Sequence, residues 1–291
     1  MKTVFIAGAT GYLGKHLVAV YRARGWHVRA LVRDAAKARA AGLPASELIE
    51  AEATQPETLQ GVMDGADLVI SSLGITRQKD GLSYWDVDYQ ANANLLDAAI
   101  EAKVERFAYV HVLGADLMEG VPLIDAKQAF VDELTAATIA STIIAPSGYF
   151  SDMADFLTMA RSGRVWAFGS GQNRLNPIHG ADLAAATADA IETGQDWLDV
   201  GGPDVFTQDE LANVAFAALG HPSKITHLPD WIRRAVLAIL PRVTPARVHG
   251  PIQFFLTALG HDMVGECHGK MHLEDHFAEM VFKDPQGRAG A

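Results

Sequence analysis

A glycine-rich turn near the N-terminus constrains the fold of this chain more than any other feature. The three glycines Gly8, Gly11 and Gly14 lie between an apolar run and an amphipathic stretch, Thr3–Ala7 and Tyr12–Arg24. Gly8 permits a tight turn, and Gly11 lets the backbone come close to a pyrophosphate. Gly14 lets the helix pack closely on the strand. A glycine triad in a strand–turn–helix context predicts a dinucleotide-binding site.

The helix that follows this turn would supply the phosphate contacts. We expect the backbone amides of Tyr12 and Leu13 to point at the phosphates, with the positive end of the helix dipole behind them. The predicted cofactor contacts also include Thr10 in the turn, and Ser72 and Leu73 after a later apolar run. The alternative, a structural turn without a ligand, is the less favoured interpretation.

The end of the second predicted strand distinguishes NADP from NAD. An acidic residue there would bind the ribose 2′-hydroxyl of NAD, whereas an arginine accommodates the 2′-phosphate of NADP. The sequence has Arg33 at this position and Lys37 one helical turn further on. A guanidinium group can grip a phosphate in a bidentate way and stack on adenine. Asp34 complicates this reading, and a solvated surface arginine is the alternative, but the sequence favours NADP(H).

The first half of the chain alternates apolar runs with amphipathic stretches, as repeated βα units do. The predicted strands are Thr3–Ala7, His27–Val32, Glu47–Ala51, Leu68–Ser71, Phe107–His111 and Thr142–Ala145. The predicted helices are Tyr12–Arg24, Pro56–Met63, Tyr84–Ala102 and Leu123–Ala137, followed by Ala181–Glu192 and Gln208–Leu219. Several strands are apolar on both faces, which is typical of a parallel sheet covered by helices on both sides.

We therefore expect an α/β fold, a Rossmann-type doubly wound parallel sheet in the order 3-2-1-4-5-6 with right-handed crossovers. Residues 1–150 would form the dinucleotide-binding domain. Residues 151–291, where the regular alternation ends and prolines become frequent, would form a smaller substrate lobe. Within that lobe, residues about 176–200 are expected to return to the Rossmann sheet.

Composition narrows the partners and the compartment. The chain of 291 residues is 49% hydrophobic and has a formal net charge of −11, which argues against a nucleic-acid partner and leaves a small-molecule substrate. The single cysteine, Cys267, cannot form an internal disulfide, so a reducing compartment fits best. The first strand begins close to Met1, and no apolar run is long enough to span a bilayer. We expect a cytoplasmic protein without an integral membrane segment.

Several segments resemble the atypical short-chain dehydrogenase/reductase superfamily, in its NmrA-like and divinyl-chlorophyllide-reductase-like branches. Besides the glycine turn and Arg33, these segments are Val87-Asp88-Tyr89-Gln90, Leu113-Gly114-Ala115, Pro177-Ile178-His179 and Gly201-Gly202-Pro203. The resemblance extends over nearly the whole chain and is weakest after residue 240. It implies binding of NADP(H) and reductase chemistry.

The resemblance also shows which catalytic groups are missing. Members with full dehydrogenase chemistry carry a serine at the end of the fifth strand and a Tyr-x-x-x-Lys on the next helix. Here the serine position is His111 and the tyrosine position is Leu123, while Lys127 remains. Leucine has no proton to transfer, so carbonyl–alcohol interconversion by a tyrosine is not expected. The family's usual arginine before the next proline, Pro146, is absent as well; Pro146 itself is a predicted cofactor contact.

Reduction of an activated C=C bond stays open, because it needs a less demanding proton donor. Lys127 and His111 are the candidate catalytic residues, and a histidine near its ordinary pKa suits general acid catalysis. His111 as a structural histidine is an equal alternative. Lys127 would also hold the nicotinamide ribose, as the resemblance implies. The preferred function is an NADPH-dependent reductase of an apolar, conjugated molecule of the enone or quinone type. A non-catalytic NADP(H)-binding sensor or assembly protein is the alternative.

Three other signals point to weaker hypotheses. The tail offers metal-ligand types without suitable spacing, so we predict no metal site: His261, Asp262, Cys267, His268, His272 and His276. The apolar stretch Trp231–Leu237, with a basic pair, is interpreted as a helix covering the substrate lobe rather than one touching a membrane. A group of aromatic residues would line an apolar pocket or simply pack in the core: Tyr149, Phe150, Phe156, Trp166 and Phe168.

Overall fold

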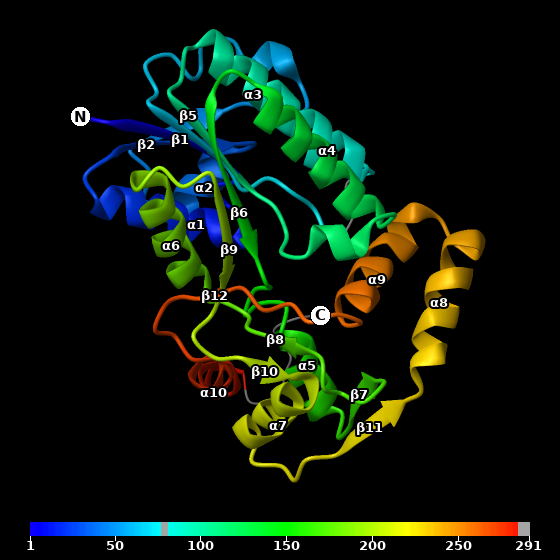
Figure 1. Cartoon of the computed structure of the whole chain (residues 1–291). Helices are drawn as coiled ribbons and strands as arrows, with labels where there is room; N and C mark the ends of the chain where they lie inside the picture. The colour runs from blue at the N-terminus through cyan, green and yellow to red at the C-terminus, as the bar shows by residue number, and fades with distance from the viewer. Residues whose placement is uncertain (77–80, 285–291) are drawn as a thin grey trace. The chain divides into compact units, whose positions relative to one another are not determined.

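The computed structural model describes residues 1–76 and 81–284, and its largest sheet contains all six predicted strands (Figure 1). These strands are β1 Thr3–Ala7, β2 His27–Val32, β3 Glu47–Glu50, β4 Leu68–Ser71, β5 Arg106–Val110 and β6 Ala140–Pro146. Two more strands, β9 Trp197–Gly201 and β12 Glu266–Cys267, extend the sheet. The order is β12-β9-β6-β5-β4-β1-β2-β3, which confirms the predicted Rossmann-type order of the first six.

The register of the sheet is parallel where the glycine turn emerges. β1 pairs with β2 on one side, Thr3 opposite His27, and with β4 on the other, Val4 opposite Leu68. All four residues of β4 are buried, as its apolar sequence predicts for a strand covered on both faces. Because β1 and β4 are neighbours, the chain order reverses at this point, and the turn after β1 lies at the switch point where such sheets bind ligands.

Helices flank the sheet, and two predicted ones differ in detail. The helices of this part are α1 Tyr12–Ala23, α2 Ala35–Ala40, α3 Ala91–Glu101, α4 Pro122–Ala136 and α6 Gly180–Glu192. The predicted helix Pro56–Met63 is wrong beyond Leu59: a 3-10 turn over Pro56–Leu59 ends before Gly61, whose φ of 69° is incompatible with a continuing helix. A π-helical segment, Trp85–Gln90, precedes α3 and makes up the start of the predicted helix Tyr84–Ala102.

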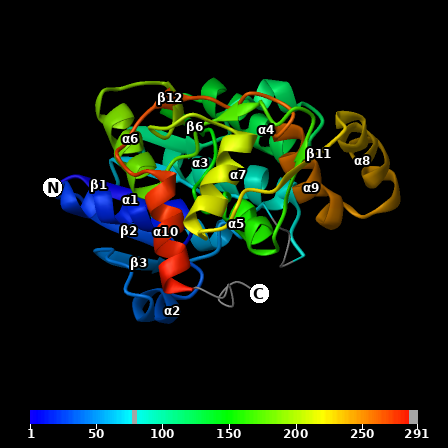
Figure 2. The same cartoon turned by 90° about the horizontal axis from the view of Figure 1, so that it is seen from below.

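The chain divides into two compact units. The first comprises Met1–Ala115, Glu119–Ala145 and Ala184–Leu198, and the second comprises Asp116–Met118, Pro146–Leu183 and Asp199–Ala291, of which residues up to 284 are described. The remaining helices are α5 Ala154–Arg161, α7 Gln208–Ala218, α8 Asp230–Val243, α9 Ala246–Ala258 and α10 Leu273–Lys283 (Figure 2). The small strands β7 Val165–Phe168 and β11 Ile225–Leu228 pair in parallel, and β8 Arg174–Leu175 and β10 Phe206–Thr207 pair antiparallel.

A large apolar cluster packs strands and helices of the first unit together. Phe5 of β1, Val69 of β4 and Phe107 of β5 are fully buried in it. Leu95 of α3 and Phe130 of α4 pack into the same cluster. Each of these side chains contributes about 1.5–3 kcal/mol by leaving water. This core packs β1, β4 and β5 against α3 and α4, the elements that carry or adjoin the candidate site.

Candidate cofactor and active site

The glycine turn after β1 is packed so tightly that side chains are excluded from two of its positions. Gly8 has φ of 77°, and a Cβ there would lie 2.8 Å from the backbone of Ser72. A Cβ on Gly14 would lie 2.0 Å from the carbonyl oxygen of Gly8. The N–H of Gly11 donates to that same oxygen over 2.9 Å, and Gly11 precedes the first residue of α1 without a side chain to cap the helix. The turn thus presents backbone to any ligand at the helix N-terminus.

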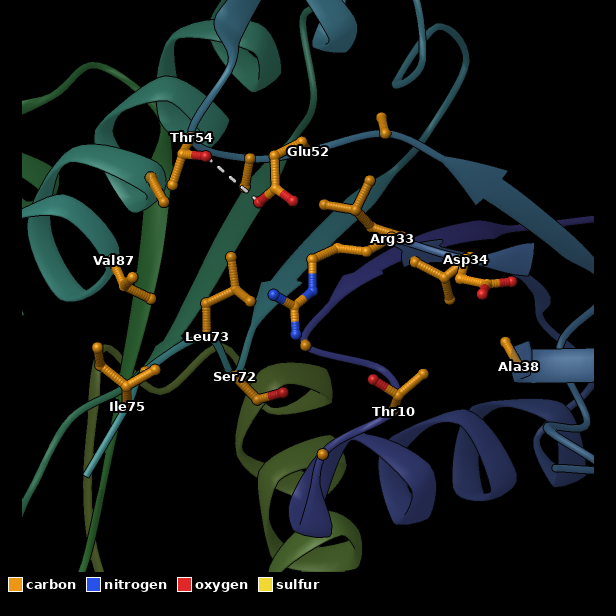
Figure 3. A pocket seen from close by; sticks show the side chains of 18 of the residues that line it. Thr10, Arg33, Asp34, Ala38, Glu52, Thr54, Ser72, Leu73, Ile75 and Val87 are labelled. Atoms are coloured by element: carbon orange, nitrogen blue, oxygen red, sulfur yellow. Dashed lines mark hydrogen bonds between the residues drawn. The ribbon is translucent and has the colours of Figure 1, made fainter. Parts of the chain in front are cut away.

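A cavity of about 830 Å³ opens beside this turn (Figure 3). Its volume lies in the range of small-molecule and cofactor sites. Of the predicted cofactor contacts, those that line it are Gly8, Thr10, Gly11, Arg33, Ser72 and Leu73. The cavity extends from the glycine turn past β2 to the segment before α3. Its wall also includes Lys37, Glu52, Gly74 and Val87. The residues that the sequence predicted as cofactor contacts come from three separate segments, and the fold brings these segments to one cavity.

Two basic residues that follow β2, Arg33 and Lys37, line the cavity together with the acidic Asp34. Figure 3 shows the guanidinium of Arg33 extending into the cavity toward Ser72 and Leu73. The carboxylate of Asp34 accepts the backbone N–H of Lys37 over 2.8 Å and so caps α2. In the same view the Asp34 side chain points away from Arg33. Asp34, whose acidic side chain made the sequence interpretation less simple, thus caps the N-terminus of α2.

Lys127 of α4 is a buried cation with a buried anionic partner. Its Nζ lies 3.3 Å from Oδ1 of Asp88, a fully buried carboxylate in the π-helical segment. The ammonium also donates to the carbonyl oxygen of Val110 over 3.1 Å and to the hydroxyl of Tyr109 over 3.3 Å. β5 and the segment before α3 therefore fix the position of the Lys127 side chain.

Asp88 is the residue of this site that sequence reasoning missed. Burial raises its pKa to about 6, although Lys127 and the backbone N–H of Ile75 act in the opposite direction. A Cβ on Gly74 would lie 2.7 Å from Asp88 Oδ1 and 3.0 Å from Lys127 Nζ, so the ion pair packs directly against Gly74 in the cavity wall. In the sequence, Asp88 and Asn92 are two polar residues spaced one helical turn apart; the structure shows that both are buried.

His111 follows β5 and is almost completely buried. Its Nε2 lies 3.1 Å from Oε1 of Gln128, and its ring packs near those of Tyr109 and Trp197. Burial, with a further contribution from the charge of Lys127, lowers the pKa of His111 to about 4. The imidazole is therefore neutral at pH 7, which weakens the case for it as a general acid.

Two other predicted positions have clear surroundings. Leu123, at the tyrosine position, is buried on the same helix as Lys127. Pro146 is the last residue of β6 and belongs to the second unit, whereas the other predicted cofactor contacts belong to the first. The contact of Pro146 with a cofactor stays a prediction.

The remaining candidates of the sequence analysis are dispersed. Phe150 is buried against the rings of His179 and His276, while Trp166 is about half exposed beside Arg164. The tail residues have separate partners: His272 pairs with Asp204 over 2.7 Å, and Asp262 pairs with Arg174. Within residues 1–76 and 81–284, no three histidine, cysteine or acidic side chains come close enough to hold a metal ion. The same ranges contain no helix that combines the length and apolarity needed to cross a bilayer.

Curated relatives share a large part of the sequence. Divinyl chlorophyllide a 8-vinyl-reductase of Zea mays is 28% identical over 266 residues, which cover 82% of this chain and 64% of that protein. Photosystem II assembly factor Ycf39 of Cyanophora paradoxa is 29% identical over 151 residues, 52% of this chain and 47% of that protein. The chain thus spans less than two thirds of the length of these relatives. Their names include a reductase and an assembly factor.

Solved structures share the fold. The NADPH-dependent quinone oxidoreductase QOR2 of Escherichia coli, crystallised with NADPH, superposes with a TM-score of 0.73 at 20% identity. The match covers 96% of this chain and 99% of that one. This likeness confirms the Rossmann-type α/β architecture.

The model of a family described as NAD(P)H-binding matches residues 8–193. The match begins at Gly8 of the glycine turn and includes Arg33, Asp88, His111 and Lys127. The predicted cofactor class and the resemblance to atypical short-chain reductases are thereby confirmed. The chain belongs to the NAD(P)H-binding family.

Proposed function

We propose that this protein is an NADPH-dependent reductase of an apolar, conjugated small molecule, of the enone or quinone type. The single observation that carries the proposal is the continuous wall from the glycine turn to Gly74, with the buried Lys127–Asp88 pair directly behind it. A cavity built only to bind a nucleotide would not need a cation–carboxylate pair held out of water at its far end, because burying such a pair is costly. Names of relatives and structural neighbours, which include reductases, support the same class.

The preference for NADPH over NADH rests on the groups after β2. Arg33 reaches into the cavity, Lys37 lines it, and the Asp34 carboxylate is engaged at the start of α2. Two basic side chains in the cavity wall, with the Asp34 carboxylate engaged by a backbone N–H, favour a 2′-phosphate over a 2′-hydroxyl.

Lys127 is the better of the two candidate catalytic residues. When bound, NADPH supplies a hydride to one carbon of the substrate; this chain must hold the cofactor and deliver a proton to the other end of the conjugated system. The Lys127 ammonium carries protons and is fixed by Asp88 and Val110. His111, with a pKa of about 4, is protonated in roughly one molecule in a thousand at pH 7. Its neutral ring would have to donate instead.

A second function is favoured by Leu123. An apolar, buried side chain at the position of the phenol removes the usual proton donor. An NADP(H)-binding protein that senses the cofactor or acts in assembly needs no such donor, and one relative is named an assembly factor. Tight binding of NADPH without turnover would be its signature.

The experiment measures NADPH binding and NADPH oxidation in parallel, with a panel of quinones and enones as acceptors. We expect turnover with at least one acceptor, and Lys127→Met should lower the rate about 10²- to 10⁴-fold, since a general acid contributes that much. His111→Asn should cost less, and Lys15→Met, which changes an exposed lysine of α1, should change nothing. Equal rates for Lys127→Met and the unmutated protein would contradict the mechanism. Binding of NADPH without oxidation by any acceptor would favour the sensor.

A further inference from the structure

Helices α8 and α9 form a hairpin whose outer surface is unusually apolar; we call it the α8–α9 hairpin, residues 230–258. Both general views draw the two helices next to each other at the rim of the second unit (Figures 1 and 2). No residue of α8 is buried. Three large apolar side chains of α8 are mostly exposed: Trp231 68%, Ile239 58% and Val243 68%.

The exposed apolar side chains share one face. Trp231, Ala235 and Ile239 are spaced four residues apart along α8, so they form one stripe. Val248 and Ile252 are exposed with the same spacing on α9. The inward side of α8 instead holds a polar contact: Arg233 donates to Asp230 over 2.7 Å and to the carbonyl oxygen of Leu256 in α9 over 3.0 Å. Ile232, Val236, Leu237 and Leu240 of α8 are half-buried, so α8 has apolar side chains on its inward side as well as the exposed Trp231, Ile239 and Val243 on its outer side.

The charge of the hairpin is opposite to that of the chain. The segment contains one acidic residue, Asp230, and four arginines: Arg233, Arg234, Arg242 and Arg247. The whole chain, in contrast, carries a net charge of −11. Arg234 and Arg242 are exposed on α8, where Arg234 pairs with Asp230 over 2.6 Å, and Arg247 is exposed at the start of α9. Cationic and apolar side chains thus occupy the same outer surface.

We propose that the outer face of the α8–α9 hairpin binds the surface of a membrane that contains anionic lipids. The hairpin lies in the interface, with Trp231, Ile239 and Val243 among the lipid chains near the headgroups. Arg234 and Arg242 reach the lipid phosphates while their aliphatic stems stay in apolar surroundings. An apolar stripe bordered by arginines, with tryptophan at its edge, is the pattern of helices that lie on membranes without spanning them.

The observations favour a lipid surface over two other occupants. A second copy of the chain, paired about a two-fold axis, would place the same cationic face against itself, and the arginines would repel each other. A protein partner would have to offer an acidic and apolar surface shaped to a convex helix pair, whereas a fluid lipid surface adapts to that shape. Charge complementarity with anionic headgroups distinguishes the lipid from both.

The test uses the full chain and vesicles of phosphatidylcholine alone or mixed with phosphatidylglycerol. We expect the protein to sediment with the mixed vesicles and not with the neutral ones, and high salt to release it. The fluorescence of Trp231 should shift to the blue on binding, and Trp231→Phe should remove that shift. Neutralising both arginines, Arg234→Gln with Arg242→Gln, should weaken binding roughly fivefold for each charge, equivalent to about 1 kcal/mol per residue.

Two controls keep the result interpretable. Arg39→Gln removes an exposed arginine of α2, and Trp166→Ala removes an exposed tryptophan of β7; neither should alter vesicle binding. Trp231→Glu with Ile239→Glu should abolish vesicle binding, while NADPH binding, whose cavity residues all lie outside the hairpin, is retained and reports that the chain is folded. Absence of binding to anionic vesicles would overturn the proposal, as would equal binding of the arginine variants. Dimerisation that Trp231→Glu abolishes, without lipid binding, would identify a self-interface instead.

Discussion

Lys127 and Asp88 are two opposite charges that the fold has taken out of water together. Removing solvent from an ion pair costs several kcal/mol per ion, and the pair recovers this only when geometry and further hydrogen bonds are good. Lys127 has Val110 and Tyr109 as additional acceptors, and Asp88 has the backbone N–H of Ile75. The pair is best understood as a device that holds one ammonium in one place beside Gly74, not as a source of stability.

Sequence reasoning reached Lys127 but not its partner for a physical reason. Lys127 and Arg33 stand at fixed spacings from recognisable motifs, so a linear pattern can find them. The Asp88–Lys127 contact joins residues from two different helical segments, and only the packing of α4 beside the π-helical segment creates it. The pKa of His111 was likewise beyond the sequence, because it depends on burial that no local pattern reports.

Replacing Arg33 with alanine should remove most of the preference for NADPH. The unmutated protein is expected to bind NADPH at least tenfold more tightly than NADH, because a charge-assisted bidentate contact is worth about 1.5–3 kcal/mol, or roughly 10- to 150-fold. Titration of each cofactor against both proteins by fluorescence checks this. Arg39→Ala serves as the matched control, since Arg39 is exposed on the neighbouring helix. Equal affinities for both cofactors in the unmutated protein would refute the role of Arg33.

Entire strands were more predictable than helices in this chain. β1, β2 and β4 have the predicted bounds, because apolar runs between polar turns are a local signal. The short helix α2 was missed, because its six residues are too few to show a period; its stability comes partly from Asp34 and Glu50, which accept backbone N–H groups at its start. Pro241 and Pro251 lie inside α8 and α9, although proline removes a helical N–H donor and favours a break.

The junction of β1 and α1 should be the least tolerant part of the candidate site. In Gly14→Ala the new methyl group would meet the Gly8 carbonyl oxygen at 2.0 Å and Ala9 Cα at 2.8 Å, and these backbone atoms cannot rotate away. We expect about 1–3 kcal/mol of destabilisation, as overpacking usually causes, together with weaker NADPH binding because α1 must shift. Chemical denaturation and cofactor titration measure the two effects. Lys15→Ala, at the next and exposed position, should show neither; a Gly14→Ala protein with unmutated stability and affinity would show that the junction can relax.

Stability against acid should depend on two groups that act in opposite directions. The pKa of His111 falls from 6.5 to about 4 on folding, so its contribution is present above pH 6.5 and is lost as the pH falls toward 4. The pKa of Asp88 rises from 3.8 to about 6, so folding becomes more favourable as the pH falls from about 6 toward 3.8. Each shift corresponds to about 3 kcal/mol at most, and in the unmutated protein the two largely cancel between pH 6 and 4.

His111→Asn should remove one of these two opposing effects on stability and leave that of Asp88. Although the variant is less stable at pH 7, its free energy of unfolding should decline less than that of the unmutated protein between pH 6.5 and 4. Urea denaturation at a series of pH values provides the comparison, and His221→Asn, the same substitution at an exposed histidine after α7, is measured alongside. Parallel pH profiles for His111→Asn and the unmutated protein would mean that His111 titrates normally in the folded state.

The position of β12 at the end of the sheet order has a consequence for the chain during synthesis. β1 to β6 are all translated by residue 146, yet Val200 and Gly201 of β9 receive their parallel partner only when Glu266 and Cys267 have been made. At a synthesis rate of about 5–20 residues per second, the edge of β9 stays unpaired for several seconds before β12 is made. An uncovered strand edge invites pairing with other chains. We therefore expect chaperones to bind mainly nascent chains that already contain β9 but not yet β12.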